Sequence, residues 1–175
     1  MSEQINKAAL IGGGVIGGGW AARFLLNGID VKIYDPSSDA EKAVAAMLEN
    51  ATQAMSKLTM APLAEPGKLE FVTSIEEAVK DADFIQESAP ERLDLKISIL
   101  NEIDKFCPED TLICSSTSGI KPSDLQVEMK RPEHFMVGHP FNPVYLLPLV
   151  EICGGSKTST EAKQNAADFY QEIGM

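Results

Sequence analysis

Several features are scarce in this sequence of 175 residues, and each scarcity narrows the class of protein. There are only three cysteines, Cys107, Cys114 and Cys153, and no C-x-x-C pair, so neither a disulfide framework nor a zinc site is expected. No apolar run approaches the roughly 20 residues that cross a bilayer. Residues 1–4 lack the basic side chains of a secretory leader. We therefore expect a cytoplasmic protein without a membrane segment.

Positive charge is also scarce. The chain has 15 lysines and arginines against 26 acidic residues, for a net charge of −11. Nucleic acids and anionic membranes attract basic surfaces, so neither is an expected partner, whereas a small cationic molecule is compatible with this charge. The hydrophobic fraction of 44% and the charged fraction of 23% are ordinary for a globular protein. We expect one domain over residues 1–175.

Apolar runs alternate with helical patterns along the chain, which is typical of a parallel α/β sheet. The pattern predicts strands at 7–11, 30–34, 69–72, 83–87, 111–114, 135–138 and 147–152, with helices at 15–26, about 38–58, after Ser74, from Pro90, and from a cap at Thr158 nearly to the end. Leading βα units followed by further strands predict a doubly wound, Rossmann-type, mostly parallel sheet with extra strands at one edge.

The first apolar strand runs into a glycine-rich turn, Gly12-Gly13-Gly14-Val15-Ile16-Gly17, which has the spacing G-x-G-x-x-G. In dinucleotide-binding domains the first glycine permits the tight turn, the second lets the backbone approach a pyrophosphate, and the third lets the helix pack on the strand. Gly12, Gly14 and Gly17 are therefore expected cofactor-site residues. Val15 and Ile16 open the helix whose N-terminus attracts the pyrophosphate.

Asp35 ends the second predicted strand, 23 residues after Gly12. An acidic side chain at this place accepts hydrogen bonds from the adenine ribose hydroxyls and repels a 2′-phosphate, so it predicts NAD rather than NADP. Asp35 precedes a proline, and a turn-forming aspartate is the alternative interpretation.

A second group of residues combines His139-Pro140-Phe141-Asn142-Pro143 with Glu151. Oxidation of an alcohol needs a base, and imidazole ionises close to neutral pH. A carboxylate on the other ring nitrogen would fix the tautomer and stabilise the imidazolium, and Glu151 stands in an apolar segment where an unpaired carboxylate is costly. A structural loop histidine and an edge-strand glutamate are the alternatives.

The turn Ser115–Gly119 follows another strand at its carboxyl end, where open α/β sheets bind ligands. One of its hydroxyl groups would be able to bond a substrate oxygen. A simple turn rich in serine and glycine is an equal alternative.

Together these motifs resemble the 3-hydroxyacyl-CoA dehydrogenase superfamily over nearly the whole chain. The resemblance rests on Gly12–Gly17, Asp35, Glu87 to Glu91, Lys96, Thr117-Ser118, His139–Pro143, and Glu151 twelve residues after the histidine. It implies an NAD-dependent 3-hydroxy acid dehydrogenase with His139 as the base and Glu151 as its orienting partner. It also implies that Ser118 and Asn142 bond substrate or nicotinamide, and that Ser88, Glu91 and Lys96 line the cofactor site.

The sequence departs from the acyl-CoA pattern at two places. The predicted helix after Ser38 carries only Lys42 and Lys57, beside acidic residues, and so offers little to anionic CoA. The histidine loop contains Pro140 and Pro148 where the family commonly has other residues. The whole stretch resembles members that oxidise a 3-hydroxy acid bearing a quaternary ammonium group, a cationic small-molecule substrate.

Aromatic residues in the histidine loop suit such a cation. Phe141 and Tyr145 are candidates, although Phe141 as an apolar plug beneath the nicotinamide is an equal alternative. Other possible functions are a short-chain 3-hydroxyacyl-CoA or sugar-acid 3-dehydrogenase and a non-catalytic NAD-binding module; a general base disfavours the last.

The resemblance further implies a C-terminal helical domain that completes the substrate pocket and forms most of a homodimer interface. These 175 residues do not contain it. The expectation is a truncated enzyme whose isolated domain binds NAD but turns over little or nothing.

Overall fold

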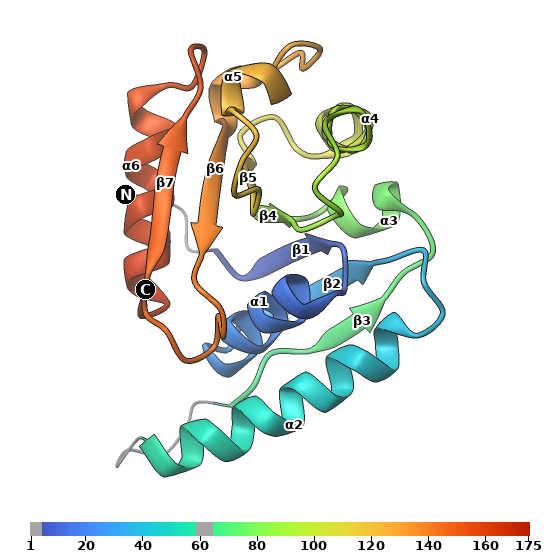
Figure 1. Ribbon diagram of the computed structural model, residues 1–175, viewed down its shortest axis with the longest axis vertical. Coiled ribbons are helices and arrows are strands. Elements are labelled where there is room, and N and C mark those ends of the chain that lie inside the picture. The colour runs from blue at the N-terminus through green and yellow to red at the C-terminus, as the bar shows by residue number, and fades with distance from the viewer. Residues whose placement is uncertain (1–4, 59–64) are drawn as a thin grey trace.

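The computed structural model describes residues 5–58 and 65–175, so the start of the chain, residues 1–4, lies outside the described part. Its centre is a seven-stranded sheet in the order β3-β2-β1-β4-β5-β6-β7 (Figure 1). The strands are β1 Lys7–Ile11, β2 Asp30–Tyr34, β3 Leu69–Phe71, β4 Phe84–Glu87, β5 Leu112–Ser115, β6 Phe135–Pro140 and β7 Val150–Gly154. All pair in parallel except β7, which runs antiparallel to β6 at the edge. The doubly wound prediction is confirmed.

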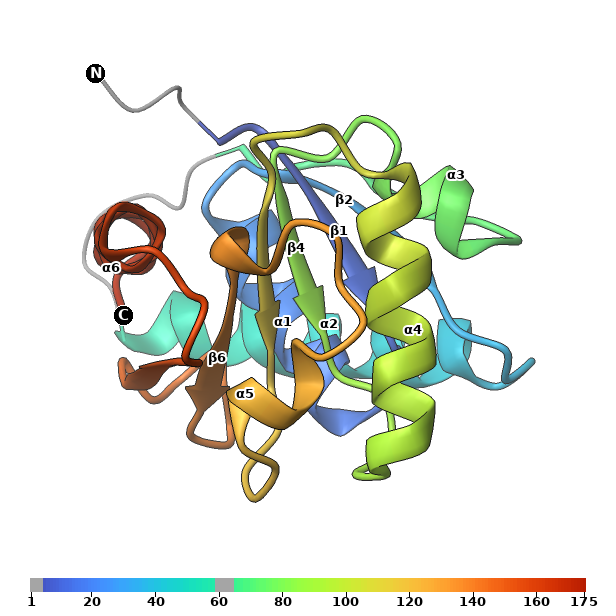
Figure 2. The same ribbon diagram turned by 90° about the horizontal axis from the view of Figure 1, so that it is seen from above.

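Helices cover both faces of this sheet (Figures 1 and 2). One face holds α1 Val15–Leu26, α2 Ala40–Leu58 and α6 Thr160–Glu172, and the other holds α3 Ile75–Val79, α4 Leu93–Phe106 and α5 Pro122–Leu125, with the 3₁₀ turn η1 Pro132–His134 before β6. Within the described ranges, no helix is both long enough and apolar enough to cross a membrane.

The two helical layers exist because β1 is apolar on both sides. Ala8 and Leu10 face the core beneath α1 and α6, whereas Ala9 and Ile11 face the core beneath α3 and α4. Buried parallel strands have this continuous apolar character because helices cover both of their faces.

An aromatic cluster anchors α6 to α1 and the central strand. Trp20 and Phe24 of α1, Phe84 of β4, and Phe169 and Tyr170 of α6 have neighbouring ring centroids 4.4–5.9 Å apart. Such aromatic pairs add specific geometry to the burial of large apolar surfaces. The last helix is therefore an integral part of the sheet's packing.

Several predicted boundaries differ from the structure by one to three residues, and three of the differences have a clear physical reason. α4 begins at Leu93 rather than at Pro90, because residues 88–92 form a turn in which Arg92 N donates to Pro90 O (2.7 Å). The cap of α6 is Ser159, whose Oγ accepts from Ala162 N, whereas the Thr158 hydroxyl donates to Phe135 O. β7 begins at Val150 rather than at residue 147, because residues 141–149 form the connecting loop.

Candidate functional site

The candidate residues gather at one edge of the sheet because parallel strands end together. Gly12 follows β1, Asp35 follows β2, Ser88 follows β4, Thr117 lies in the turn after β5, and His139 lies near the end of β6. This carboxyl edge is where open α/β sheets bind ligands, around the point at which the strand order reverses. Here that point lies between β1 and β4.

The glycine turn has the geometry that a bound pyrophosphate needs. Gly12 has a φ of +103°, in the left-handed region that side chains disfavour. A Cβ on Gly17 would overlap the Gly12 carbonyl oxygen, so the helix and turn approach too closely for any side chain. A Cβ on Gly14 would have no heavy atom within 4 Å, so the surface before α1 is open. With Val15 and Ile16 in the first turn, the amides at this helix start fit a phosphate group.

The Asp35 carboxylate accepts hydrogen bonds from the turns after β1 and β2 and can still accept further hydrogen bonds from a ligand. Its Oδ2 accepts from Gly13 N at 2.6 Å and its Oδ1 from Ser37 N at 2.7 Å. A carboxylate has about four lone-pair positions, so two remain for ribose hydroxyls. The turn-forming role is therefore real and is compatible with the cofactor role.

Lys96 is a buried ionic residue of α4. Its side chain is 1% exposed, and its ammonium group donates to both Glu87 oxygens, at 2.7 and 3.0 Å, and to Ala89 O at 2.9 Å. These three acceptors use all three donors of the ammonium group. Through these bonds Lys96 positions the β4–α4 turn that carries Glu91, and a place for it in the lining of the cofactor site stays a prediction.

Glu91 joins that turn to the turn after β5. One oxygen, Oε1, accepts from the Thr117 hydroxyl (2.5 Å), Ser118 N (3.1 Å) and Gly119 N (3.0 Å). Burial raises the pKa of Glu91, but these donors and nearby Lys96 outweigh it, so the pKa lies below its ordinary value. Glu91 thus fixes the turn that presents the exposed Ser118.

His139 and Glu151 face each other across the antiparallel pair β6–β7. His139 Nδ1 and Glu151 Oε2 are 2.9 Å apart, with the two side chains 28% and 64% exposed. A carboxylate accepts only, so Nδ1 carries a hydrogen, and in the neutral imidazole Nε2 then presents the lone pair. The spacing of twelve residues is the separation that opposite strand positions create here.

The loop between these strands is held by α1. The buried Arg23 guanidinium donates to Val144 O at 3.0 and 3.3 Å, and a Cβ on Gly19 would lie 3.0 Å from Val144. Phe141 is 37% exposed and meets the His139 ring edge-on at 5.5 Å between centroids. Asn142 is exposed beside it and precedes a cis proline.

Sequence reasoning missed the buried polar residues that support the site. Glu87 is 0% exposed and accepts four hydrogen bonds, from Lys96 twice, from Ser115 and from Ala89 N. Gln86 and Ser116 belong to a second hydrogen-bond network, together with Trp20, Ser88 and Tyr170. A charged and an amide side chain inside a buried strand were the available signal, because such groups require partners.

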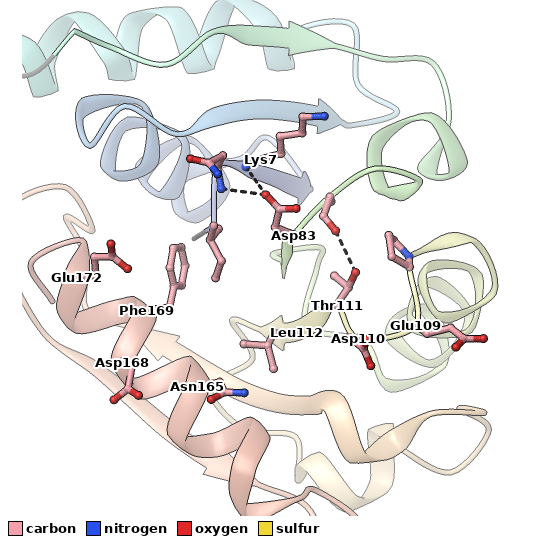
Figure 3. A pocket seen from close by; sticks show the side chains of 14 residues that line it. Lys7, Asp83, Glu109, Asp110, Thr111, Leu112, Asn165, Asp168, Phe169 and Glu172 are labelled. Atoms are coloured by element: carbon pink, nitrogen blue, oxygen red, sulfur yellow. Dashed lines mark hydrogen bonds between the residues drawn. The ribbon is translucent and has the colours of Figure 1, made fainter. Parts of the chain in front are cut away.

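A hollow of about 640 Å³ lies at the opposite, amino edge of the sheet (Figure 3). Two of its polar side chains make structural bonds: Asp83 accepts from the backbone nitrogens of Asn6 and Lys7, both at 2.9 Å, and the Thr111 hydroxyl donates to Ala82 O. None of the predicted site residues lines this hollow.

Comparison with known proteins gives one consistent family. Residues 7–175 match the model described as "3-hydroxyacyl-CoA dehydrogenase, NAD binding domain". The chain is 58% identical over 172 residues to an L-carnitine dehydrogenase of Mesorhizobium japonicum, covering 98% of this chain and 47% of the relative. It is 59% identical over 171 residues to an L-carnitine dehydrogenase/betainyl-CoA thioesterase of Rhizobium meliloti, covering 98% of this chain and 34% of the relative.

Among solved structures, 5-formyl-3-hydroxy-2-methylpyridine 4-carboxylic acid 5-dehydrogenase, an NAD-dependent dismutase, superposes with a TM-score of 0.90 at 33% identity. That match covers 98% of this chain and 56% of the other. The chain spans about a third to a half of the length of the two curated relatives.

Proposed function

The chain belongs to the family of 3-hydroxyacyl-CoA dehydrogenase NAD-binding domains, and we propose that it is the cofactor-binding part of an NAD-dependent L-carnitine dehydrogenase. The reaction would convert the 3-hydroxyl of L-carnitine to a ketone, with a hydride passing from C3 to NAD and the hydroxyl proton to the enzyme. The observation that carries the proposal is the His139–Glu151 pair at the edge where the cofactor residues gather.

His139 is the proposed base. Since Nδ1–H is directed to Glu151, Nε2 is the atom that would take the hydroxyl proton, and the carboxylate would stabilise the resulting imidazolium. Ser118 and Asn142, both exposed at this edge, are proposed to bond the reacting oxygen or the nicotinamide. General base catalysis by a positioned histidine is worth about 10²- to 10⁴-fold in rate.

The residues of the carboxyl edge fit NAD, which supplies the hydride acceptor when bound. The open surface at Gly14 and the start of α1 would hold the pyrophosphate, and Asp35 would hold the adenine ribose. The negative charge of Asp35 disfavours the 2′-phosphate of NADP. The cytoplasm is the proposed site of action.

A cationic substrate is supported by the charges around the site and by similar proteins. Lys42 and Lys57 of α2 stand among exposed acidic residues such as Glu41 and Glu49, which suits a CoA phosphate poorly. Phe141 offers a half-exposed ring beside His139. A cation on such a ring gains about 0.5–2 kcal/mol. The two relatives above carry the name L-carnitine dehydrogenase.

The test compares substrates in this chain joined to the remainder of the Mesorhizobium japonicum relative. We expect kcat/KM with NAD to be far higher for L-carnitine than for 3-hydroxybutyryl-CoA, 3-hydroxybutyrate or the neutral carbon isostere of carnitine. If the CoA ester is the better substrate at matched concentrations, the carnitine proposal fails and an acyl-CoA dehydrogenase replaces it.

The chain alone provides a second test. We propose that it binds NADH but oxidises carnitine slowly or not at all, because an open site positions substrate poorly and admits water. We also propose that homodimer contacts lie outside these residues. Robust carnitine oxidation by the chain alone would contradict the first statement, and a dimer of the chain alone in sedimentation analysis would contradict the second.

A further inference from the structure

A chain of hydrogen bonds runs from Tyr170 of α6 through Gln86 and Ser116 to Ser88, which follows β4 at the carboxyl edge. Ser116 Oγ is 3.1 Å from Trp20 Nε1, 2.9 Å from Gln86 Nε2 and 2.9 Å from Ser88 Oγ. The indole nitrogen of Trp20 is a donor only. The direction of each remaining bond follows from the orientation of Gln86.

The orientation of Gln86 is fixed by two neighbours. Its Nε2 lies 3.2 Å from the Gly138 carbonyl oxygen, which accepts only, so the amide nitrogen must face that side. Its Oε1 then faces Tyr170 at 2.7 Å and accepts from the phenol. Gln86 Nε2 therefore donates its second hydrogen to Ser116.

Ser116 thus accepts two hydrogen bonds, from Trp20 and from Gln86. A hydroxyl has two lone pairs and one hydrogen, so the hydrogen of Ser116 is left for Ser88. Ser88 Oγ must accept this bond. Across residues 5–58 and 65–175, no other hydrogen-bond partner of Ser88 Oγ is found, so its own hydrogen is available to a ligand.

Ser88 stands immediately beside the glycine turn. A Cβ on Gly12 would lie 2.8 Å from the Ser88 carbonyl oxygen, and a Cβ on Gly17 would lie 3.6 Å from Ser88 Cβ. Ser88 follows β4, on the side of the reversal point away from Asp35. A dinucleotide with its adenine half at Asp35 and its pyrophosphate at Gly14 would place its second ribose over β4.

We propose that Ser88 donates a hydrogen bond to a hydroxyl oxygen of the nicotinamide ribose, and that Ser116 is the positioning residue that makes Ser88 a donor. The proposal rests on NAD binding in this cleft and is independent of the substrate. It gives Gly138 a role as well, because a Cβ there would overlap the Tyr170 hydroxyl that starts the chain of bonds.

The test measures binding of three ligands to the 175-residue chain by titration calorimetry: ADP, which lacks the second ribose; ADP-ribose, which has it; and NADH. We expect Ser88→Ala to weaken ADP-ribose and NADH by about three- to tenfold, the worth of one hydrogen bond, and to leave ADP unchanged. Ser56→Ala, which removes an exposed hydroxyl on α2, is the matched control and should change none of the three.

Unchanged affinity for all three ligands would overturn the proposal. An equal loss for ADP would place the contact on a phosphate, and a loss confined to NADH would place it on the nicotinamide ring; either result also overturns it. If the unaltered chain binds no NADH, the cofactor site itself fails, whereas a failure of carnitine specificity leaves this inference standing.

A double-mutant cycle separates positioning from general support. If Ser116 acts through Ser88, the double variant Ser88→Ala, Ser116→Ala binds ADP-ribose as weakly as Ser88→Ala alone. Additive losses would show that Ser116 acts independently and would contradict its assigned role. If Ser116→Ala does not fold, the comparison of ADP with ADP-ribose in Ser88→Ala still decides the main claim.

Discussion

The two edges of the parallel sheet are built from the same strands but differ in what their polar groups do. At the amino edge, Asp83 and Thr111 satisfy neighbouring backbone groups around a hollow of about 640 Å³ (Figure 3). At the carboxyl edge, Ser88 Oγ and His139 Nε2 keep hydrogen-bonding capacity for a ligand, while Ser88 is bonded to Ser116 and His139 to Glu151.

Open volume is therefore a poor guide to where chemistry takes place in this fold. The hollow lies where the strands begin, whereas the glycine turn, Ser88 and His139 lie where the strands end, the edge at which open α/β sheets bind ligands. The functional edge of the sheet is recognised by polar atoms that keep unused hydrogen-bonding capacity and by the hydrogen bonds that hold those atoms in place.

The largest expected effect at the carboxyl edge is on turnover. In the chain joined to the rest of the Mesorhizobium japonicum relative, His139→Gln should lower kcat by about 10²- to 10⁴-fold while NADH affinity stays nearly unchanged, because it removes only the base. Glu151→Gln should lower kcat less and move the pH profile. Steady-state kinetics across pH measures both, and full activity of His139→Gln would refute the assignment.

The next largest expected effect is on the preference for NADH over NADPH, which depends on Asp35. Asp35→Ser should weaken NADH binding by about tenfold and narrow its advantage over NADPH, since hydrogen bonds to the ribose and repulsion of the 2′-phosphate are both removed. Asp39→Ser, which removes an exposed charge nearby, is the control. Equal affinities for NADH and NADPH in the unaltered chain would end the claim.

Changes at the amino edge should affect stability alone. Asp83→Ala removes the acceptor of two backbone N–H groups at the start of β1 and should lower the free energy of unfolding by about 1 kcal/mol. Affinity for NADH should not change. Denaturant unfolding and calorimetry measure the two quantities, and weakened NADH binding would show that the edges are coupled.

The smallest effect concerns Glu91, whose pKa is lowered in the folded chain. A carboxyl with a lowered folded pKa stabilises the fold above its ordinary pKa, and that contribution disappears as the pH falls through the lowered value. The stability difference between the unaltered chain and Glu91→Gln should therefore be larger at pH 7 than near pH 3. A constant difference across this range would contradict the role given to Glu91.

Most of the fold followed from local patterns. Apolar runs such as Lys7–Ile11 and the helical period after Gly14 predicted the elements, and the glycine spacing predicted which turn would receive a pyrophosphate. The errors fell at boundaries: Pro90 is compatible with a helix start, but the bonds of Glu87 and Lys96 hold the chain in a turn until Leu93.

Residue type and short spacing were enough to predict the α/β architecture and the glycine turn, whereas the pairing of His139 with Glu151 was an open alternative until the family resemblance implied it. Only the tertiary structure decided that Lys96 is buried on Glu87 and that Ser88 is a donor. Both facts depend on hydrogen-bond partners that come from different strands and from α6. They also depend on whether each hydroxyl or amide group acts as donor or acceptor in each bond. Donors and acceptors can be assigned in this way only when segments that are far apart in the chain have been brought into contact.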